Sequence, residues 1–321
     1  MTLISGTLIT ISSTSWISAW VGLELNLMSF IPLIIKKDNQ YSSEATLKYF
    51  LVQALGSSIL IFSIILSLLE IKVTHSIMLY ALLLKLGAAP FHFWFPQVIN
   101  GLLWSQIIVL ITVQKAAPLF LLSCVFDNDL IIAFIFARSV LSARFGALGG
   151  INQTSFRKVL AFSSINHVGW LLASVIINEY ILVVYFLFYC FISGSIVLIF
   201  SYFQLFQFNQ LINLLVPSEV KLLSIFSFLS LGGLPPFTGF VPKWIIIQKL
   251  ADSLNMFLLV ILLTSALVTL YFYLRISISS LSLRISFLKA YSIRLSSFST
   301  LVFFLVFVNF FGLLFPFFTI Y

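Results

Sequence analysis

The stretch that decides the fold is LSLGGLPPFTGFVPKW, residues 229–244, which places three glycines and three prolines just before a lysine in an apolar region. A second stretch, KLGAAPFHFWFP at 85–96, places a glycine and two prolines around another lysine. Proline removes a backbone donor and clashes with the preceding turn, so each stretch predicts a helix that breaks within the membrane. Such a break is tolerated only against protein or a water-filled cavity.

The composition indicates that the rest of the chain also lies in a membrane. Of the 321 residues, 61% are hydrophobic and 8% are charged, and the mean hydropathy is +1.16. A typical soluble domain has about 25% charged residues. The chain is therefore predicted to be an all-α polytopic membrane protein. Although its formal charge is +8, the basic residues are too few and too scattered for a phosphate-binding face, so we expect no nucleic-acid partner.

About 20 apolar residues are needed to span a bilayer as a helix, and the chain divides into about eleven such stretches. The expected helices are 3–19, 21–36, 44–70, 76–95, 103–124, 130–150, 155–176, 180–207, 222–250, 254–277 and 297–319. The two broken helices are the fourth and the ninth, five spans apart. This spacing predicts one membrane domain over 1–321, built from inverted five-helix repeats at 3–124 and 130–277 with 297–319 as an extra C-terminal helix.

The basic residues in the expected loops are distributed unevenly between the two sides. With alternating loops, nine Lys or Arg residues fall on the side of the N-terminus and two on the other. Positive residues accumulate on the cytoplasm-like side. We therefore expect the N-terminus on the cytoplasm-like side, which in a mitochondrial inner membrane would be the matrix side, with the C-terminus on the intermembrane-space side.

Four charged residues are expected deep inside apolar helices: Glu24, Lys85, Lys115 and Lys243. A charge at bilayer depth costs at least about 2.5–3.5 kcal/mol on insertion scales, so these residues require a polar interior. A lysine that pairs alternately with a carboxylate can bind and release a proton, because desolvation disfavours its charged form and the carboxylate favours it. They are therefore candidates for a proton relay. The alternative is that the same charges only lock the helices together.

His167 is a fifth candidate, since it lies among hydroxyl and amide side chains in SSINH, residues 163–167. Histidine titrates near neutral pH and could relay protons between Lys115 and Lys243. The alternative is a histidine that simply hydrogen-bonds a neighbouring helix. 

Three further residues are accessory candidates, and two arginines are unexplained. Lys48 lies about one turn inside its helix, His92 follows the break in the fourth helix, and Lys158 lies nine residues before His167. Arg144 is close enough to a helix end to extend its guanidinium to the interface. Arg138 is close to the middle of its helix and has no partner that the sequence reveals.

The sequence contains no Walker motif, nucleophile–base pair or cluster of metal ligands. Its two cysteines, Cys124 and Cys190, lie in apolar runs and are expected to be small buried residues without a disulfide. We therefore expect the chain to bind no cofactor or metal and to carry no redox site of its own.

Together the motifs resemble one family over residues 7–275. The stretches that carry the resemblance are WVGLELNLMSFIPL (20–33), EATLKYFLVQALGS (44–57), LLLKLGAAPFHFWFP (82–96), GGINQTSFRKVLAFSSINHVGW (149–170) and LSLGGLPPFTGFVPKW (229–244). They occur in the order seen in the antiporter-like membrane subunits of respiratory complex I, mitochondrial NADH:ubiquinone oxidoreductase, in their shortened animal form. Related subunits are found in multi-subunit sodium/proton antiporters.

The resemblance implies a function and a set of roles. Glu24 is similar to the family's carboxylate, Lys85 to its lysine partner, Lys115 to the central lysine, Lys243 to the lysine of the second broken helix and His167 to a histidine between them. Family members translocate protons, driven by electron transfer elsewhere in the complex, where FMN, iron–sulfur clusters and ubiquinone are expected. The implied partners are the other membrane-arm subunits. Phospholipids, including cardiolipin, are expected at the basic loops.

Two other functions remain open from the sequence. The chain could be a cation/proton antiporter subunit that works independently of NADH, or a structural membrane subunit whose buried charges are scaffolding only. 

Overall fold

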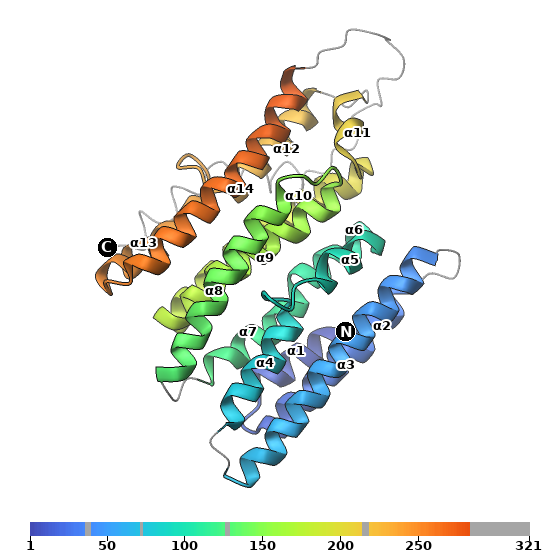
Figure 1. The fold of residues 1–321 in the computed structure, drawn as a ribbon. Coiled ribbons are helices and arrows are strands. Elements are labelled where there is room, and N and C mark those ends of the chain that lie inside the picture. The colour runs from blue at the N-terminus through green and yellow to red at the C-terminus, as the bar shows by residue number, and fades with distance from the viewer. Residues whose placement is uncertain (36–39, 71–72, 126–128, 214–217, 283–321) are drawn as a thin grey trace.

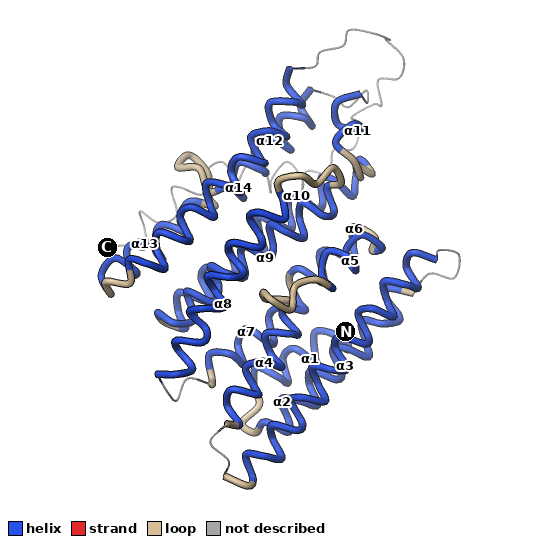
Figure 2. The backbone as a smooth tube through the Cα atoms, viewed as in Figure 1, coloured by secondary structure: helices blue, strands red, loops and turns tan. Residues whose placement is uncertain are grey.

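The computed structural model describes residues 1–35, 40–70, 73–125, 129–213 and 218–282, and nearly all of this part of the chain is helical (Figures 1 and 2). The helices are α1 (Thr2–Ser12), α2 (Trp16–Ile34), α3 (Gln40–Leu68), α4 (Thr74–Leu86), α5 (Trp94–Gly101), α6 (Trp104–Ile111), α7 (Val113–Ser123), α8 (Asp129–Gly150), α9 (Phe156–Ile177), α10 (Glu179–Phe203), α11 (Phe208–Asn213), α12 (Ser218–Gly232), α13 (Phe240–Asp252) and α14 (Met256–Ser282).

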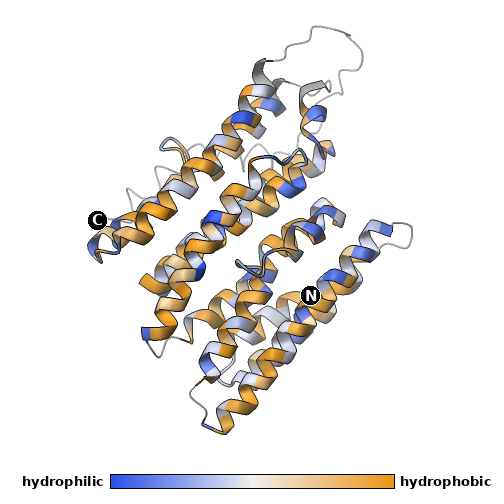
Figure 3. Ribbon diagram, viewed as in Figure 1, coloured by the Kyte–Doolittle hydropathy of each residue, from blue (hydrophilic) through white to orange (hydrophobic). Residues whose placement is uncertain are grey.

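Seven helical stretches of the described residues are long and apolar enough to cross a membrane. These are Trp16–Ile34, Gln40–Leu68, Trp104–Ser123, Asp129–Gly150, Phe156–Ile177, Glu179–Phe203 and Met256–Ser279. Three further apolar helices are shorter, and apolar residues dominate the bundle (Figure 3). A polytopic all-α membrane protein is thus confirmed. The expected helix 297–319 lies outside the described residues.

The first turn lies earlier than the sequence predicted. A break was expected near residue 20, but α1 ends at Ser12 and α2 begins at Trp16, so Trp20 lies inside α2. The reason is local: the Ser15 hydroxyl accepts a hydrogen bond from the Ser18 amide at 3.3 Å and so caps α2. Serine favours such caps over helix interiors. The span predicted as 3–19 is therefore only the 11-residue α1.

The fifth expected span contains an interruption that the sequence did not predict. At Thr112 the backbone adopts φ −102° and ψ −77°, and this residue separates α6 from α7. The Thr112 amide and hydroxyl both donate to the Ile108 carbonyl, at 3.0 and 2.7 Å. Lys115 consequently lies in the first turn of α7.

Both breaks predicted from glycine and proline are present. The chain leaves α4 through Gly87 (φ +70°) and resumes as α5, and it leaves α12 through Gly233 (φ +75°) and resumes as α13. Glycine adopts this left-handed conformation without the steric penalty of a Cβ atom. These non-helical segments are drawn in tan in Figure 2.

Small residues let several helices approach closely. A Cβ atom added at Gly146 of α8 would meet the Asn166 amide and would lie 2.8 Å from Asn166 Cα on α9. One added at Gly169 of α9 would lie 2.8 Å from the Ala143 amide on α8. The two halves of the chain meet where α5 packs on α9 and α6 packs on α10. Close backbone approach through small residues is a general means of packing helices in membranes.

We predict that Gly146→Ala separates α8 from α9 and reduces the amount of folded protein, because overpacking costs about 1–3 kcal/mol. Gly194→Ala on α10 is the matched control, since nothing lies within 4 Å of its added Cβ. Quantitative native gels of solubilised membranes should show a loss for Gly146→Ala and near-normal amounts for Gly194→Ala. Equal amounts of the two variants would contradict the packing argument.

Candidate functional site

Lys115 lies at the meeting point of the two halves. Its side chain is 2% exposed. The ammonium donates to the Ser164 carbonyl of α9 at 3.2 Å and to the Tyr189 hydroxyl of α10 at 3.5 Å. It also lies 4.8 Å from the centre of the Phe95 ring on α5. A carbonyl and aromatic faces are thus the groups that replace water around this cation.

His167 lies next to Lys115 through a shared tyrosine. The histidine is 6% exposed, and its Nδ1 lies 3.0 Å from the Tyr185 hydroxyl. Its ring centre is 4.9 Å from that of Tyr189, whose hydroxyl accepts from Lys115. The two predicted residues are therefore brought together, with Tyr189 between them.

Lys243 is buried at the second helix break. It is 4% exposed, and its ammonium donates to the carbonyls of Gly232 at 2.9 Å and Leu231 at 3.3 Å. These carbonyls end α12 and have no partner within that helix, and the negative end of the helix dipole favours a cation there. The Trp170 ring centre lies 5.8 Å from the ammonium.

A small cavity connects His167 with the second break. Its volume is about 10 Å³, which is near the lower limit for one water molecule. The lining includes His167, Tyr185, Tyr189, Leu231 and Pro242. Polar atoms of α9 and α10 therefore share this space with the segment that binds the Lys243 ammonium.

The described residues Lys85 and Glu24 lie near each other but form no ion pair within 4.0 Å. Lys85, on the last turn of α4, is 6% exposed, and its carbonyl accepts from Gln53 of α3 at 3.2 Å. The side chain runs past Gly56, where an added Cβ would lie 2.9 Å from Lys85 Cγ. Glu24 of α2 is half-buried, and its charge acts on Lys85, although no ion pair within 4.0 Å joins these two described residues.

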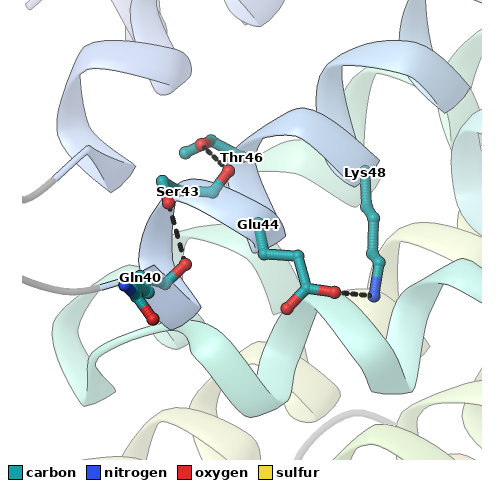
Figure 4. A network of polar contacts seen from close by, with 5 residues as sticks. All are labelled: Gln40, Ser43, Glu44, Thr46 and Lys48. Atoms are coloured by element: carbon teal, nitrogen blue, oxygen red, sulfur yellow. Dashed lines mark hydrogen bonds and ion pairs between the residues drawn. The ribbon is translucent and has the colours of Figure 1, made fainter.

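The three accessory candidates lie together in a separate, open pocket of about 470 Å³. Lys48 pairs with Glu44 at 2.8 Å and is partly exposed (Figure 4). Lys158 lines the same pocket. His92 also lines it; this residue is 5% exposed, and its Nδ1 has no hydrogen-bond partner. The structure does not bring these residues into contact with the buried lysines.

Arg138 has aromatic partners that the sequence did not reveal. Its guanidinium lies 4.4 Å from the ring centre of Phe134, 5.5 Å from that of Tyr80 and 5.9 Å from that of Phe91. Phe134 lies four residues earlier on the same helix face, which sequence spacing can indicate. Tyr80 and Phe91 come from other segments. Arg144 is exposed in the isolated chain.

Sequence reasoning missed Tyr185 and Tyr189, which carry the contacts between the charged residues. It also missed a partly buried hydrogen-bonded set formed by Asn26, Tyr49 and Gln114. Polar side chains in apolar helices were the available signal. They include tyrosine, asparagine and glutamine as well as the charged residues.

Neither cysteine forms a disulfide. Cys190 is partly buried, but Cys124 is exposed, so the expectation that it is buried was wrong. Its position explains the exposure, because Cys124 caps the end of α7. Among the described residues, no group of three or more His, Cys, Asp or Glu side chains could hold a metal ion.

Comparison with known proteins identifies the family. The model of the transmembrane NADH:quinone oxidoreductase/Mrp antiporter family matches residues 13–76 and 67–269. The NADH-ubiquinone oxidoreductase chain 2 of Anopheles gambiae is 51% identical over 287 residues, which is 86% of this chain and 83% of that protein. The protein of the same name from Aedes aegypti is 49% identical with the same coverage. The chain belongs to the NADH-ubiquinone oxidoreductase chain 2 family. This assignment confirms the prediction from the sequence motifs.

Solved structures agree with membership of this family. A chain of respiratory complex I from Thermus thermophilus is 26% identical, with a TM-score of 0.77 over 86% of this chain and 68% of that chain. A chain of the Mrp complex from Dietzia is 19% identical, with a TM-score of 0.79 over 87% of this chain and 59% of that chain. At 19% identity, the similarity to the Mrp chain shows a common fold only.

We predict that Gly233→Ala disturbs the second break and displaces Lys243. An alanine would carry the strained φ of +75°, and its Cβ would lie 2.9 Å from Lys243 Cδ and 3.0 Å from the ammonium. The left-handed conformation alone costs about 1–2 kcal/mol in a non-glycine residue. The neighbouring Gly232→Ala is the control, since its nearest contact would be an ordinary 3.5 Å from Tyr273.

The measurement is proton pumping per electron in membranes with matched amounts of assembled complex. Gly233→Ala should lower this ratio, whereas Gly232→Ala should leave it near normal. A normal ratio in both variants would show that the Lys243 carbonyl site does not depend on this turn.

Proposed function

We propose that the chain is a core membrane subunit of respiratory complex I that translocates protons, with Glu24, Lys85, Lys115, His167 and Lys243 as a buried relay. The observation that carries this proposal is the line of contacts from Lys115 through Tyr189 to His167, between the two broken helices. Electron transfer, FMN, iron–sulfur clusters and ubiquinone belong to other subunits of the complex. The chain is thus part of a proton-translocating oxidoreductase without a redox site of its own.

The separation of Glu24 from Lys85 suggests how the relay is driven. When the two side chains pair, the carboxylate stabilises the charged lysine, and when they separate this stabilisation is lost. About 1.4 kcal/mol changes a proton affinity tenfold, whereas moving a proton against 100 mV costs about 2.3 kcal/mol. To drive one proton against 100 mV, the change in the pair would therefore have to alter the proton affinity of Lys115 by between about ten- and a hundredfold.

We propose inverted five-helix repeats as the architecture that supports the relay, with 297–319 as an additional span. Corresponding contacts support this arrangement. In the first half α1 packs on α2, α2 on α3 and α3 on α4; in the second half α8 packs on α9, α9 on α10 and α10 on α12. The repeats then place one broken helix in each half.

The proposed location is the mitochondrial inner membrane, with the N-terminus in the matrix and the other membrane-arm subunits as partners. The excess of basic loop residues on one side supports this orientation. Phospholipids are further proposed partners. The open pocket supports their binding, because Lys158 lines it beside the Lys48–Glu44 pair and can contact an anionic headgroup such as that of cardiolipin.

We predict that Lys115→Met leaves the complex assembled and lowers the number of protons pumped per electron, because it removes the proton-binding group at the junction of the halves. Lys249→Met is the control, since Lys249 is exposed and pairs with Asp252 at 3.7 Å outside the relay. Proton uptake and NADH oxidation should be measured on the same vesicles. An unchanged ratio in Lys115→Met would reject the relay, and sodium flux without NADH would favour the antiporter function.

A further inference from the structure

Two buried polar side chains, Asn26 and Tyr49, and the partly buried Gln114 form a hydrogen-bonded bridge between α2, α3 and α7. The Gln114 Nε2 donates to the side-chain Oδ1 of Asn26 at 2.9 Å, and the Gln114 Oε1 accepts from the Tyr49 hydroxyl at 3.0 Å. Asn26 is 2% exposed and Tyr49 is 1% exposed. Breaking either bond would leave a buried polar group without a partner, which is unfavourable. The Gln114 amide is therefore held from both ends.

This bridge lies immediately beside Lys115. Successive residues of a helix point about 100° apart, so Gln114 contacts α2 and α3 while Lys115 contacts α9 and α10. The helix is interrupted just before this turn, at Thr112. If α6 and α7 were one continuous helix, the backbone of α6 would fix the direction in which Lys115 points. Because the helix is interrupted at Thr112, the side-chain hydrogen bonds of Gln114 hold the first turn of α7 instead.

The same face of α3 also holds the Lys85 segment. Gln53 lies one turn after Tyr49 and donates to the Lys85 carbonyl at 3.2 Å. The Tyr49 ring packs against Trp94 at 6.1 Å, and the Trp94 indole donates to the Leu84 carbonyl across the break between α4 and α5. One helix therefore sets the relative positions of Lys85 and Lys115.

We propose that Gln114 is a positioning residue that directs the Lys115 ammonium towards Ser164 and Tyr189 and ties its helix turn to α2, the helix of Glu24. This inference rests on the proposed function of Lys115 as a relay. It assigns no proton transfer to Gln114 itself. Its role is to keep the lysine aligned with its next partner while the Glu24–Lys85 pair changes.

The test compares Gln114→Met, Lys115→Met and the double variant by protons pumped per electron in the assembled complex. We expect Gln114→Met to cause at least half of the decrease seen in Lys115→Met, and the double variant to be no lower than Lys115→Met. Gln106→Met is the matched control. Gln106 also makes two hydrogen bonds, donating to the Leu33 carbonyl at 2.6 Å and accepting from the Leu103 amide at 2.8 Å, and it should keep a normal ratio.

Each other outcome has a definite meaning. A normal ratio in Gln114→Met with a decrease in Lys115→Met would overturn the positioning role and leave the proposed function standing. Additive decreases in the double variant would also overturn it, since Gln114 would then act without Lys115. A normal ratio in Lys115→Met would reject both proposals.

Tyr49→Phe provides a second variant if Gln114→Met does not assemble. It removes one hydroxyl and keeps the ring contacts with Phe30 and Trp94. We expect a smaller decrease in the ratio that disappears when Lys115 is already Met. No decrease, or a decrease that persists without Lys115, would overturn the proposal.

Discussion

The structure depends on the binding of ammonium groups in an apolar bundle by main-chain carbonyls and aromatic rings. Lys243 takes two carbonyls that the break after α12 leaves without helical partners, and Lys115 takes the Ser164 carbonyl and a tyrosine hydroxyl. A buried charge without such partners would be prohibitively costly. The glycine- and proline-rich break after α12 thus also supplies the carbonyls that allow Lys243 to be buried.

This constraint accounts for where the residues of the proposed relay lie. Neither Lys115 nor Lys243 forms an ion pair among the described residues. When a lysine releases its proton, it loses less interaction free energy if its ammonium is bound by neutral dipoles than if it is bound by a carboxylate. The groups that contact Lys115 and His167 come mostly from α9 and α10, which are the helices that the first half packs against through α5 and α6. The junction between the halves is therefore where the proposed relay would pass a proton from one half to the other.

Much of this arrangement could be predicted from local sequence, and some of it could not. Glycine and proline beside Lys85 and Lys243 act on the backbone directly, so both breaks were predictable. The interruption at Thr112 carries no such residue type, and the early end of α1 depends on a serine cap in a stretch without charges. The aromatic rings around Arg138 come from three segments. Partners of this kind depend on tertiary packing, which one sequence without a structure does not define.

The most direct measurement removes both charges of the proposed Glu24–Lys85 pair in one variant. In a Glu24→Gln, Lys85→Met double variant no unpaired charge remains, so a purely structural role for these residues predicts normal assembly and normal pumping. If the pair controls the proton affinity of Lys115, the assembled complex will pump fewer protons per electron, measured as proton uptake against NADH oxidation on the same vesicles. An unchanged ratio at normal turnover would contradict the account.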